Sequence, residues 1–386
     1  MAELKVEVVE VTNVRHHNNA DRLDVVQVYG YDVVTGRDEY KDGDLAVYFP
    51  VDAILPQELE DFIFAGGKMK LNKNRVRPAR IRGWVSQGLL VSLDVISKYK
   101  SGLPLGLGKD LTKELGVTKR DVEKNKPKVL QGRQTSKKET NPFFRKYTSI
   151  QHLKKYGDCF EKYQEVIVTE KIHGTNFRCG WVPTVARTWI DKIRVKLGKS
   201  KWPLIAMLGL DEFTFVFGSH NVQLKAKDNT YYNDGKEKAK VSVYEQCVIA
   251  YDLADKIPFG YVAYGEIFGP GIQKGYGYGL KDGEFDVRFF DVQNSVTGMY
   301  VDFFIMQDML TMLGLKVVPW EVTAYNKSDL NDAMNNNRMK SRLDDKTDVE
   351  GLVIRSYNET TYLGGRAIMK WISDRYLLKK GMTEFK

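Results

Sequence analysis

The chain has 386 residues, of which 42% are hydrophobic and 12% aromatic, a composition that indicates a folded core and excludes a disordered chain. Its 59 Lys and Arg residues outnumber 50 Asp and Glu residues, and the resulting net charge of +9 favours an anionic partner such as nucleic acid. No stretch approaches the roughly 18 apolar residues of a membrane span, and the start, MAELKVEVVEV, is too charged for a secretory signal. We therefore expect a soluble intracellular protein without membrane attachment, in the cytoplasm, with an organellar location left open.

The first hundred residues contain short alternating runs (VEVVEV, LDVVQVYGYDVV, LAVYFPV, GLLVSL) separated by turn-forming sequences. This pattern is typical of a small β-barrel, and we assign residues 1–100 to an OB-type barrel. Arg75, Arg77, Arg80 and Arg82 lie close together in it, followed by Trp84. Basic and aromatic side chains in this combination predict a nucleic-acid-binding face. A basic edge strand that protects the sheet against aggregation is the alternative.

The composition changes between residues 101 and 141, which contain ten Lys or Arg residues, five Asp or Glu residues and few apolar residues. We predict a basic linker there, either a solvated connector or a segment that follows phosphates. From residue 142 to residue 386 helical and strand-like stretches alternate. This second domain is predicted to have an α+β fold.

The stretch TEKIHGTNF places Lys171 at the end of a predicted strand, because the preceding EVIVTE is β-branched and alternating. Gly174 follows and predicts a tight turn in which the backbone can come close to a ligand. A lysine at a strand mouth can act as a nucleophile when its surroundings lower its pKa and a phosphate is held in line. The motif alone is weak, so its neighbours decide the interpretation.

Further charged and aromatic residues occur at the ends of later strands. Glu266 ends the strand in VAYGEIFGPG, Phe290 precedes an aspartate in VRFFDVQ, Glu350 begins the strand in DVEGLVIRS, and Lys370 lies within AIMKWIS. Each has a structural alternative, such as a solvated carboxylate or a core phenylalanine. Together they describe a pocket for a nucleoside triphosphate and its magnesium ion.

From Phe144 to Lys370 the chain resembles the ATP-dependent RNA ligases of the RNA ligase 2 type, which belong to the covalent nucleotidyltransferase superfamily. The segments FRKYTSI, EKIHGTN, YGEIFGPGIQ, RFFDV and VEGLVI match the motifs of that family in the same order. NADRLDVVQV and RVRPARIRGWVSQGLLVSL resemble OB-fold modules that bind tRNA. The resemblance implies an N-terminal OB barrel followed by an antiparallel-sheet nucleotidyltransferase domain of the ATP-grasp-like ligase type.

The resemblance also implies roles for individual residues. Lys171 would attack the α-phosphate of ATP and carry AMP covalently, with Ile172 beside it among the nucleotide-binding residues. Glu170 would contact the adenine edge or the backbone next to it, and Phe290 would stack on the adenine ring.

The remaining implied roles concern the ribose, the phosphates and the metal. Glu266 would hold the ribose and, with Glu350, the Mg²⁺ or Mn²⁺ ion, which Glu350 would orient. Asn176 would place the phosphates or the polynucleotide end. Lys370 would neutralise charge on the α-phosphate. Carboxylates that hold a metal and cations that face phosphates suit a transition state with spread negative charge.

Three departures from the family pattern stand out. His173 occupies a place where many members of the superfamily have aspartate. RNA ligase 2 members share the histidine. The FGSHNVQL segment lacks the usual arginine, so His220, Arg178 or another residue is expected to take over its contact with the nucleotide or the RNA end. Ile368 stands where a second lysine is common in the last motif, which makes the role of Lys370 a weaker inference.

The interpretation is an RNA ligase that joins 3′-hydroxyl and 5′-phosphate ends of nicked duplexes or broken RNA as a monomer. The alternatives are a non-catalytic RNA-binding protein with a degenerate ligase domain, and a DNA ligase or capping-type nucleotidyltransferase.

Overall fold

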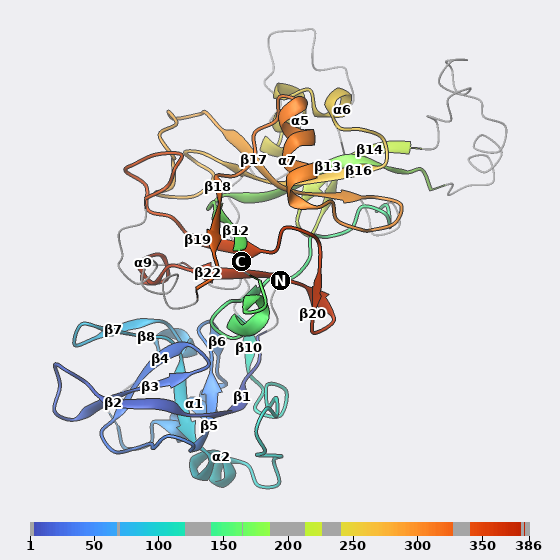
Figure 1. Ribbon diagram of the computed structural model, residues 1–386. Helices are drawn as coiled ribbons and strands as arrows, with labels where there is room; N and C mark the ends of the chain where they lie inside the picture. Colours follow the sequence, from blue (N-terminus) through green and yellow to red (C-terminus); the bar gives the residue numbers. More distant parts are fainter. Residues whose placement is uncertain are drawn as a thin grey trace.

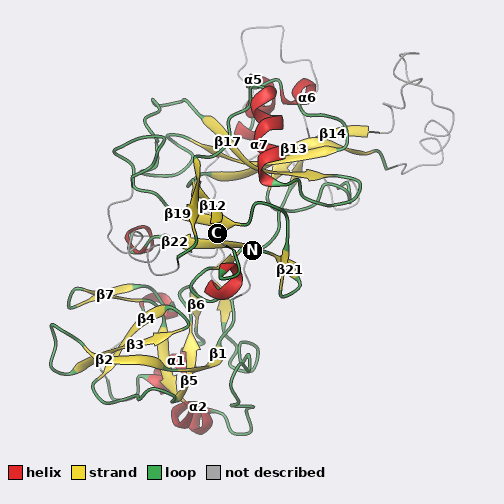
Figure 2. Ribbon diagram, viewed as in Figure 1, coloured by secondary structure: helices red, strands yellow, loops and turns green. Residues whose placement is uncertain are grey.

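The computed structural model describes residues 4–67, 70–119, 140–163, 165–185, 213–225, 241–326, 340–379 and Met382. Figures 1 and 2 show two units, an N-terminal barrel at the bottom of the view and a larger mixed unit above it. The fold is α+β with mostly antiparallel sheets, as the sequence predicts. Within the described residues, no helix combines the length and the apolar character needed to cross a membrane.

The N-terminal unit is built from short strands with one buried face. Strand β4, for example, alternates strictly between buried and partly buried residues, as expected for a barrel wall. Its sheets have the orders β1-β5-β9 and β2-β3-β4, with the additional pairs β7-β8 and β6-β10. The elements are β1 (Glu7–Glu10), β2 (Thr12–His16), β3 (Leu23–Val28), β4 (Tyr31–Gly36), β5 (Leu45–Phe49), β6 (Ala53–Ile54), α1 (Gln57–Ile63), η1 (Asn72–Asn74), β7 (Ala79–Ile81), β8 (Trp84–Ser86), β9 (Leu89–Ser92), α2 (Leu93–Tyr99) and β10 (Thr118–Lys119).

This unit extends beyond residue 100, which corrects the predicted start of the linker. Leu111, Leu115 and Val117 are buried in the same cluster as Val6 and Val8, and β10 pairs with β6. These spaced apolar residues pack the first part of the predicted linker against the barrel, although its charge density suggested a solvated connector. The rest of the predicted linker, residues 120–139, lies outside the described residues.

The second unit contains two five-stranded sheets, with the orders β11-β22-β19-β12-β18 and β15-β14-β13-β16-β17. All of their pairings are antiparallel except that of β11 with β22. The elements are β11 (Gln151–His152), η4 (Gly157–Phe160), β12 (Glu165–Lys171), β13 (Thr175–Pro183), β14 (Phe213–Ser219), β15 (Gln223–Leu224), α5 (Val243–Ala250), α6 (Leu253–Lys256), β16 (Tyr261–Phe268), β17 (Asp286–Asn294), α7 (Phe303–Met312), β18 (Trp320–Ala324), β19 (Gly351–Arg355), β20 (Thr361–Tyr362), β21 (Gly365–Arg366), β22 (Ile368–Ile372) and α9 (Asp374–Leu377).

The chain crosses from one sheet to the other at Gly174, between β12 and β13. A Cβ atom at this position would lie 2.2 Å from the carbonyl oxygen of Ile267 on β16, so the crossing requires glycine. The close approach is to the backbone of β16, and the approach to a ligand expected at Gly174 stays a prediction. The crossing places the end of β12, with Lys171, at the junction of the two sheets.

The two units touch through a small set of polar contacts. The Gln87 side chain, just after β8, donates to Asp374 at the start of α9 (2.6 Å) and accepts from Lys154 (2.7 Å). The Tyr31 ring lies 5.2 Å from the His152 ring. The barrel therefore contacts β11 and α9, the neighbours of the strand that carries Lys370.

Candidate active site

Lys171 and Lys370 lie on the same face of one sheet. The register pairs Thr169 with Val353 and Val353 with Lys370, and Lys171 follows Thr169 by two residues, so all these side chains share a face. Gly351 pairs directly with Lys171, and a Cβ atom there would lie 2.0 Å from the carbonyl oxygen of Trp371, so the close approach of β19 and β22 beside the lysine requires glycine. The sheet therefore brings together the first and last predicted catalytic lysines.

Glu350 joins the lysine to the histidine of the same motif. One carboxylate oxygen contacts Lys171 Nζ, and the other lies 2.9 Å from His173 Nδ1. The Glu350 side chain is 1% exposed, whereas that of Lys171 is 22% exposed. A buried carboxylate between two cationic or proton-bearing partners is well compensated, and the lysine keeps access to solvent and ligands.

Three tyrosines surround His173. The rings of Tyr276 and Tyr376 meet its imidazole edge-to-face at 4.6 and 5.0 Å, and the His173 backbone N–H donates to the hydroxyl of Tyr278 (2.7 Å). Burial raises the pKa of all three tyrosines. The hydroxyls of Tyr278 and Tyr376, the latter 3.2 Å from His173 Nδ1, and the Tyr276 ring together fix the position of the histidine that contacts Glu350.

Glu266 and Asn176 lie side by side on adjacent strands of the second sheet. They are register partners on β16 and β13, and Glu266 accepts a hydrogen bond from the Gly174 N–H (3.1 Å). The side-chain oxygen of Asn176 is buried without a hydrogen-bond partner in the described part of the chain. Such an atom is costly unless a ligand or water satisfies it, which marks this side of the junction as a binding position.

Phe290 occupies a β-bulge. The register between β16 and β17 pairs Tyr264 with Asp291 and Gly265 with Phe289, so Phe290 has no partner. Bulges re-aim side chains next to active sites. Phe290 packs against the cluster that contains Ile172 and edge-to-face against Tyr147 at 5.0 Å. The aromatic ring predicted to stack on adenine therefore packs against the apolar cluster to which Ile172, the residue after Lys171, belongs.

Glu170 points away from Lys171. Its carboxylate accepts hydrogen bonds from the Ser341 hydroxyl (2.5 Å) and the Arg342 backbone N–H (2.9 Å). Burial raises its pKa, while these two hydrogen bonds act in the opposite direction. Glu170 therefore binds the segment that leads to Glu350, and its expected contact with the adenine edge or the backbone next to it stays a prediction.

The predicted metal ligands fit an ion held mainly by nucleotide phosphates. The described residues contain no group of three or more His, Cys, Asp or Glu side chains placed to bind a metal ion. Mg²⁺ commonly uses one or two carboxylates together with phosphates and waters. Glu350, with the hard oxygen donors of a carboxylate, suits that role, with Glu266 on the facing sheet.

The arginines predicted to bind nucleic acid fall into two groups, and two of them require correction. Arg178 is 2% exposed, donates to the carbonyls of Ser219 (2.9 Å) and Phe144 (2.6 Å), and stacks on the Phe144 ring. Burial lowers its pKa to about 10. Arg75 is buried against Asp52. Both guanidinium groups bind partners in the protein interior, so neither can make the predicted contact with a polynucleotide.

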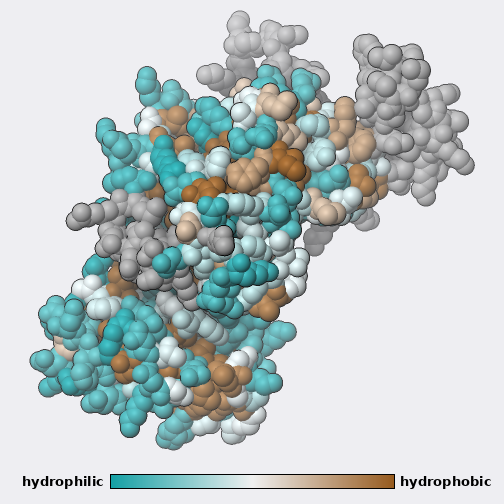
Figure 3. Space-filling view, in the orientation of Figure 1, coloured by the Kyte–Doolittle hydropathy of each residue, from teal (hydrophilic) through white to brown (hydrophobic). Residues whose placement is uncertain are grey.

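Arg77, Arg80 and Arg82 are exposed on and beside the β7–β8 hairpin. Figure 3 shows hydrophilic residues over most of this part of the barrel, at the lower left. Trp84 is partly buried, donates from its indole to Asp32 (2.9 Å) and lies under Arg15. The exposed charge of this face is as predicted, but its tryptophan is already covered by an arginine.

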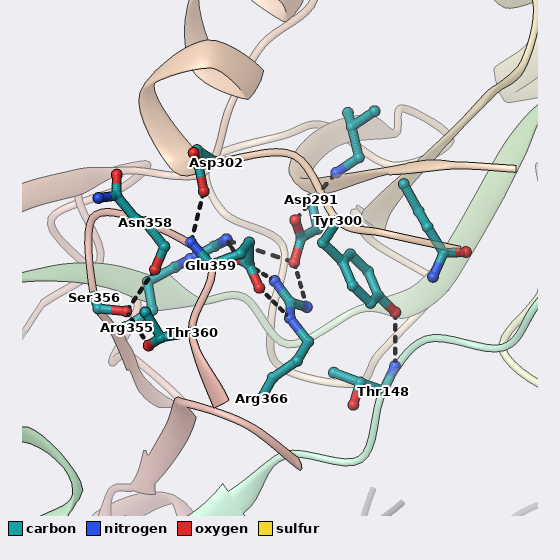
Figure 4. A network of polar contacts seen from close by, with 12 residues as sticks. Thr148, Asp291, Tyr300, Asp302, Arg355, Ser356, Asn358, Glu359, Thr360 and Arg366 are labelled. Atoms are coloured by element: carbon teal, nitrogen blue, oxygen red, sulfur yellow. Dashed lines mark hydrogen bonds and ion pairs between the residues drawn. The ribbon is translucent and has the colours of Figure 1, made fainter. Parts of the chain in front are cut away.

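A buried ion network joins the two sheets next to Phe290 (Figure 4). Asp291 on β17 contacts Arg366 (2.8 Å), Arg355 (3.4 Å) and the Tyr147 hydroxyl (2.8 Å). Arg366 also binds Glu359 and stacks on the Tyr300 ring at 3.6 Å. Because β17 and β19 belong to different sheets, this network fixes the distance between the Phe290 side and the Lys171 side.

A family model for RNA ligase matches residues 164–372, which is more than half of the chain. The chain belongs to the RNA ligase family. A model for an OB-fold domain matches residues 5–93. No curated protein sequence matches the chain.

Solved structures of a Naegleria gruberi RNA ligase share the fold. An apo mutant of that ligase matches with a TM-score of 0.72 and 20% identity over 98% of both chains. A mutant with ATP and Mn matches with a TM-score of 0.71 and 20% identity over 96% of this chain and 98% of that one, and a mutant with AMP and Mn has the same TM-score and identity over 97% and 98%. The predicted order of an OB barrel before a ligase domain is thereby confirmed.

Sequence reasoning missed two parts of this RNA ligase site. The tyrosines around His173 include Tyr276 and Tyr278, which lie in the glycine-rich segment KGYGYG, for which the sequence predicts no site residue. The network of Asp291, Arg355, Glu359 and Arg366 left no signal, because its members come from separate elements.

Proposed function

We propose that this chain is an ATP-dependent RNA ligase that joins 3′-hydroxyl and 5′-phosphate ends, in nick sealing or RNA repair. The observation that carries the proposal is the contact of Lys171 with Glu350 at the junction of the two sheets, with Phe290 and Glu266 nearby. Membership of the RNA ligase family supports it. The ATP and AMP carried with Mn by the Naegleria structures support a nucleotide and a divalent metal ion.

The first step is self-adenylylation. The neutral Lys171 amine attacks the α-phosphorus of ATP, a phosphorus–nitrogen bond forms, and the bond to the leaving pyrophosphate breaks. Lys171 must first lose its proton and leave Glu350, whose carboxylate lies in contact with it. A divalent metal ion would offset phosphate charge when bound. Lys370 adds a positive charge on the same face.

The remaining two steps use the same pocket. The terminal 5′-phosphate oxygen of RNA attacks the lysine-bound AMP and releases Lys171. The 3′-hydroxyl then attacks the adenylylated 5′-phosphate, forms the phosphodiester and releases AMP. Phe290 would hold adenine by stacking throughout, while Ile172 lines the base side and Glu266 and Asn176 hold the ribose and phosphates.

The exposed Arg77, Arg80 and Arg82 of the barrel are proposed to contact RNA phosphates. Joining of a nicked RNA duplex, with ATP and Mg²⁺, tests the proposed function. The unaltered chain should form the joined strand, and Lys171→Ala should not. Adenylylation by GTP in preference to ATP would favour a capping-type enzyme. Exclusive sealing of DNA would favour a DNA ligase, and RNA binding without any nucleotide transfer would favour a non-catalytic RNA-binding protein.

A further inference from the structure

Three cationic side chains converge on Asp348, two residues before Glu350. Lys340 Nζ lies 2.8 Å from its carboxylate, Arg375 Nε 3.1 Å and Lys379 Nζ 3.4 Å. The Asp348 side chain is 13% exposed, whereas the three cations are 42%, 49% and 37% exposed. One carboxylate therefore organises three cations whose charged ends reach solvent.

The electrostatics of Asp348 fit this arrangement. Its single carboxylate faces the two lysines and the arginine at hydrogen-bonding or ion-pair distance. It offsets one of the three positive charges that it holds in place.

This Asp348 cluster lies at the rim of the proposed active site. Lys379 donates to the Tyr276 hydroxyl (3.0 Å) and lies over its ring at 4.6 Å. The same ring also contacts the imidazole of His173, at 4.6 Å. One aromatic layer therefore separates the cluster from the motif that contains Lys171.

The Asp348 cluster also adjoins the barrel. Arg375 belongs to α9, and the first residue of α9, Asp374, accepts a hydrogen bond from Gln87. Gln87 immediately follows β8 of the hairpin that presents Arg80 and Arg82. Figure 1 shows α9 on the same side of the molecule as β7 and β8. The cluster thus lies between the exposed arginines of the barrel and the reactive lysine.

We propose that Lys340, Arg375 and Lys379 form a phosphate-binding track that guides the RNA strand from the OB barrel to Lys171. This inference rests on the proposed RNA ligase function. The cations come from two segments, Lys340 on one and Arg375 and Lys379 in and just after α9. All three are partly exposed, which suits the phosphates of an RNA backbone at the surface better than one enclosed anion. Asp348 holds them together and offsets only one of their three charges.

The test is binding of a fluorescent nicked RNA duplex, without nucleotide, measured by anisotropy between roughly 50 and 200 mM salt. The double variant Lys340→Gln/Arg375→Gln should make the negative slope of log affinity against log salt shallower by about 1.8, because each lost phosphate contact removes about 0.9. Asp348→Asn should change affinity in the opposite direction and tighten binding. A general loss of folding would weaken both variants, so the opposite signs separate charge from damage.

Lys98→Gln is the matched control, because Lys98 forms an exposed ion pair with Asp94 at 2.6 Å on α2, within the barrel. Its salt slope should equal that of the unaltered chain. An unchanged slope in the double variant overturns the track, as does weaker ATP binding with unchanged RNA binding. Self-adenylylation of the unaltered chain is measured separately: its absence would refute the proposed function, whereas the salt slopes judge the track alone.

Discussion

The carboxylate of Glu350 contacts the amine of Lys171 and, through its other oxygen, the imidazole of His173. The contact connects β12 to the residue before β19 within one sheet. The proposed nucleophile is thus paired with a buried carboxylate.

Replacing Glu350 with glutamine tests that relationship. Glu350→Gln keeps the shape of the side chain but removes the charge that faces Lys171, and we expect the rate of self-adenylylation to fall on the order of 100-fold. Single-turnover labelling with ATP measures this rate. Glu321→Gln, an exposed carboxylate on β18 that pairs with Arg342, should leave the rate unchanged. A Glu350→Gln rate within about threefold of the unaltered rate contradicts the role.

Phe290 is expected to determine affinity for adenine. Phe290→Ala should raise the ATP KM for self-adenylylation roughly 5- to 100-fold, since stacking on a base contributes about 1–3 kcal/mol. Phe290→Tyr keeps the ring and should restore most of the affinity. If Phe290→Ala lowers stability but leaves the ATP KM unchanged, the ring packs in the core beside Tyr147 and does not bind adenine.

The network in Figure 4 is expected to stabilise the pairing of the two sheets. Arg366→Met leaves Asp291, which is fully buried, without its nearest cation and should cost about 3 kcal/mol of unfolding free energy. Denaturant unfolding measures this cost. Lys98→Met, which removes an exposed ion pair, should cost less than about 0.5 kcal/mol. Equal costs for the two variants would show that the network contributes no more than a surface pair.

The sequence predicts site residues that lie in short motifs, but it does not predict which side chains are buried or what they contact. Lys171, Glu350 and Phe290 could be predicted because each lies in a motif of a few residues at a strand end. Arg75 and Arg178 were misassigned because a guanidinium has the same letter whether it faces solvent or a buried carbonyl. The ion network could not be predicted, since Asp291 and Arg366 are brought together only by the packing of two sheets.

The stability of the chain should depend on His152, which packs between the two units. Burial, followed by the charges of Lys154 and Lys370, lowers its pKa well below the ordinary value of 6.5. The unfolded chain therefore binds a proton at this position that the folded chain does not, so stability is complete above pH 6.5 and falls as pH decreases below it. The loss is up to about 1.4 kcal/mol per pH unit.

Unfolding free energies at several pH values measure this effect. His152→Gln should reduce the slope between about pH 6.5 and 5.5, because glutamine does not titrate. His16→Gln replaces a largely exposed histidine (side chain 63% exposed) and serves as the comparison. An identical slope in His152→Gln and the unaltered chain would mean that His152 is not the group responsible.

The central claim is that Lys171 becomes covalently linked to AMP. Incubation with ATP labelled at the α-phosphate, in the presence of Mg²⁺, should label the denatured protein. The label should be released by acid, removed by pyrophosphate and absent from Lys171→Ala. A folded chain that takes up no label with Mg²⁺ or Mn²⁺, or a Lys171→Ala variant that is labelled equally, would contradict the account.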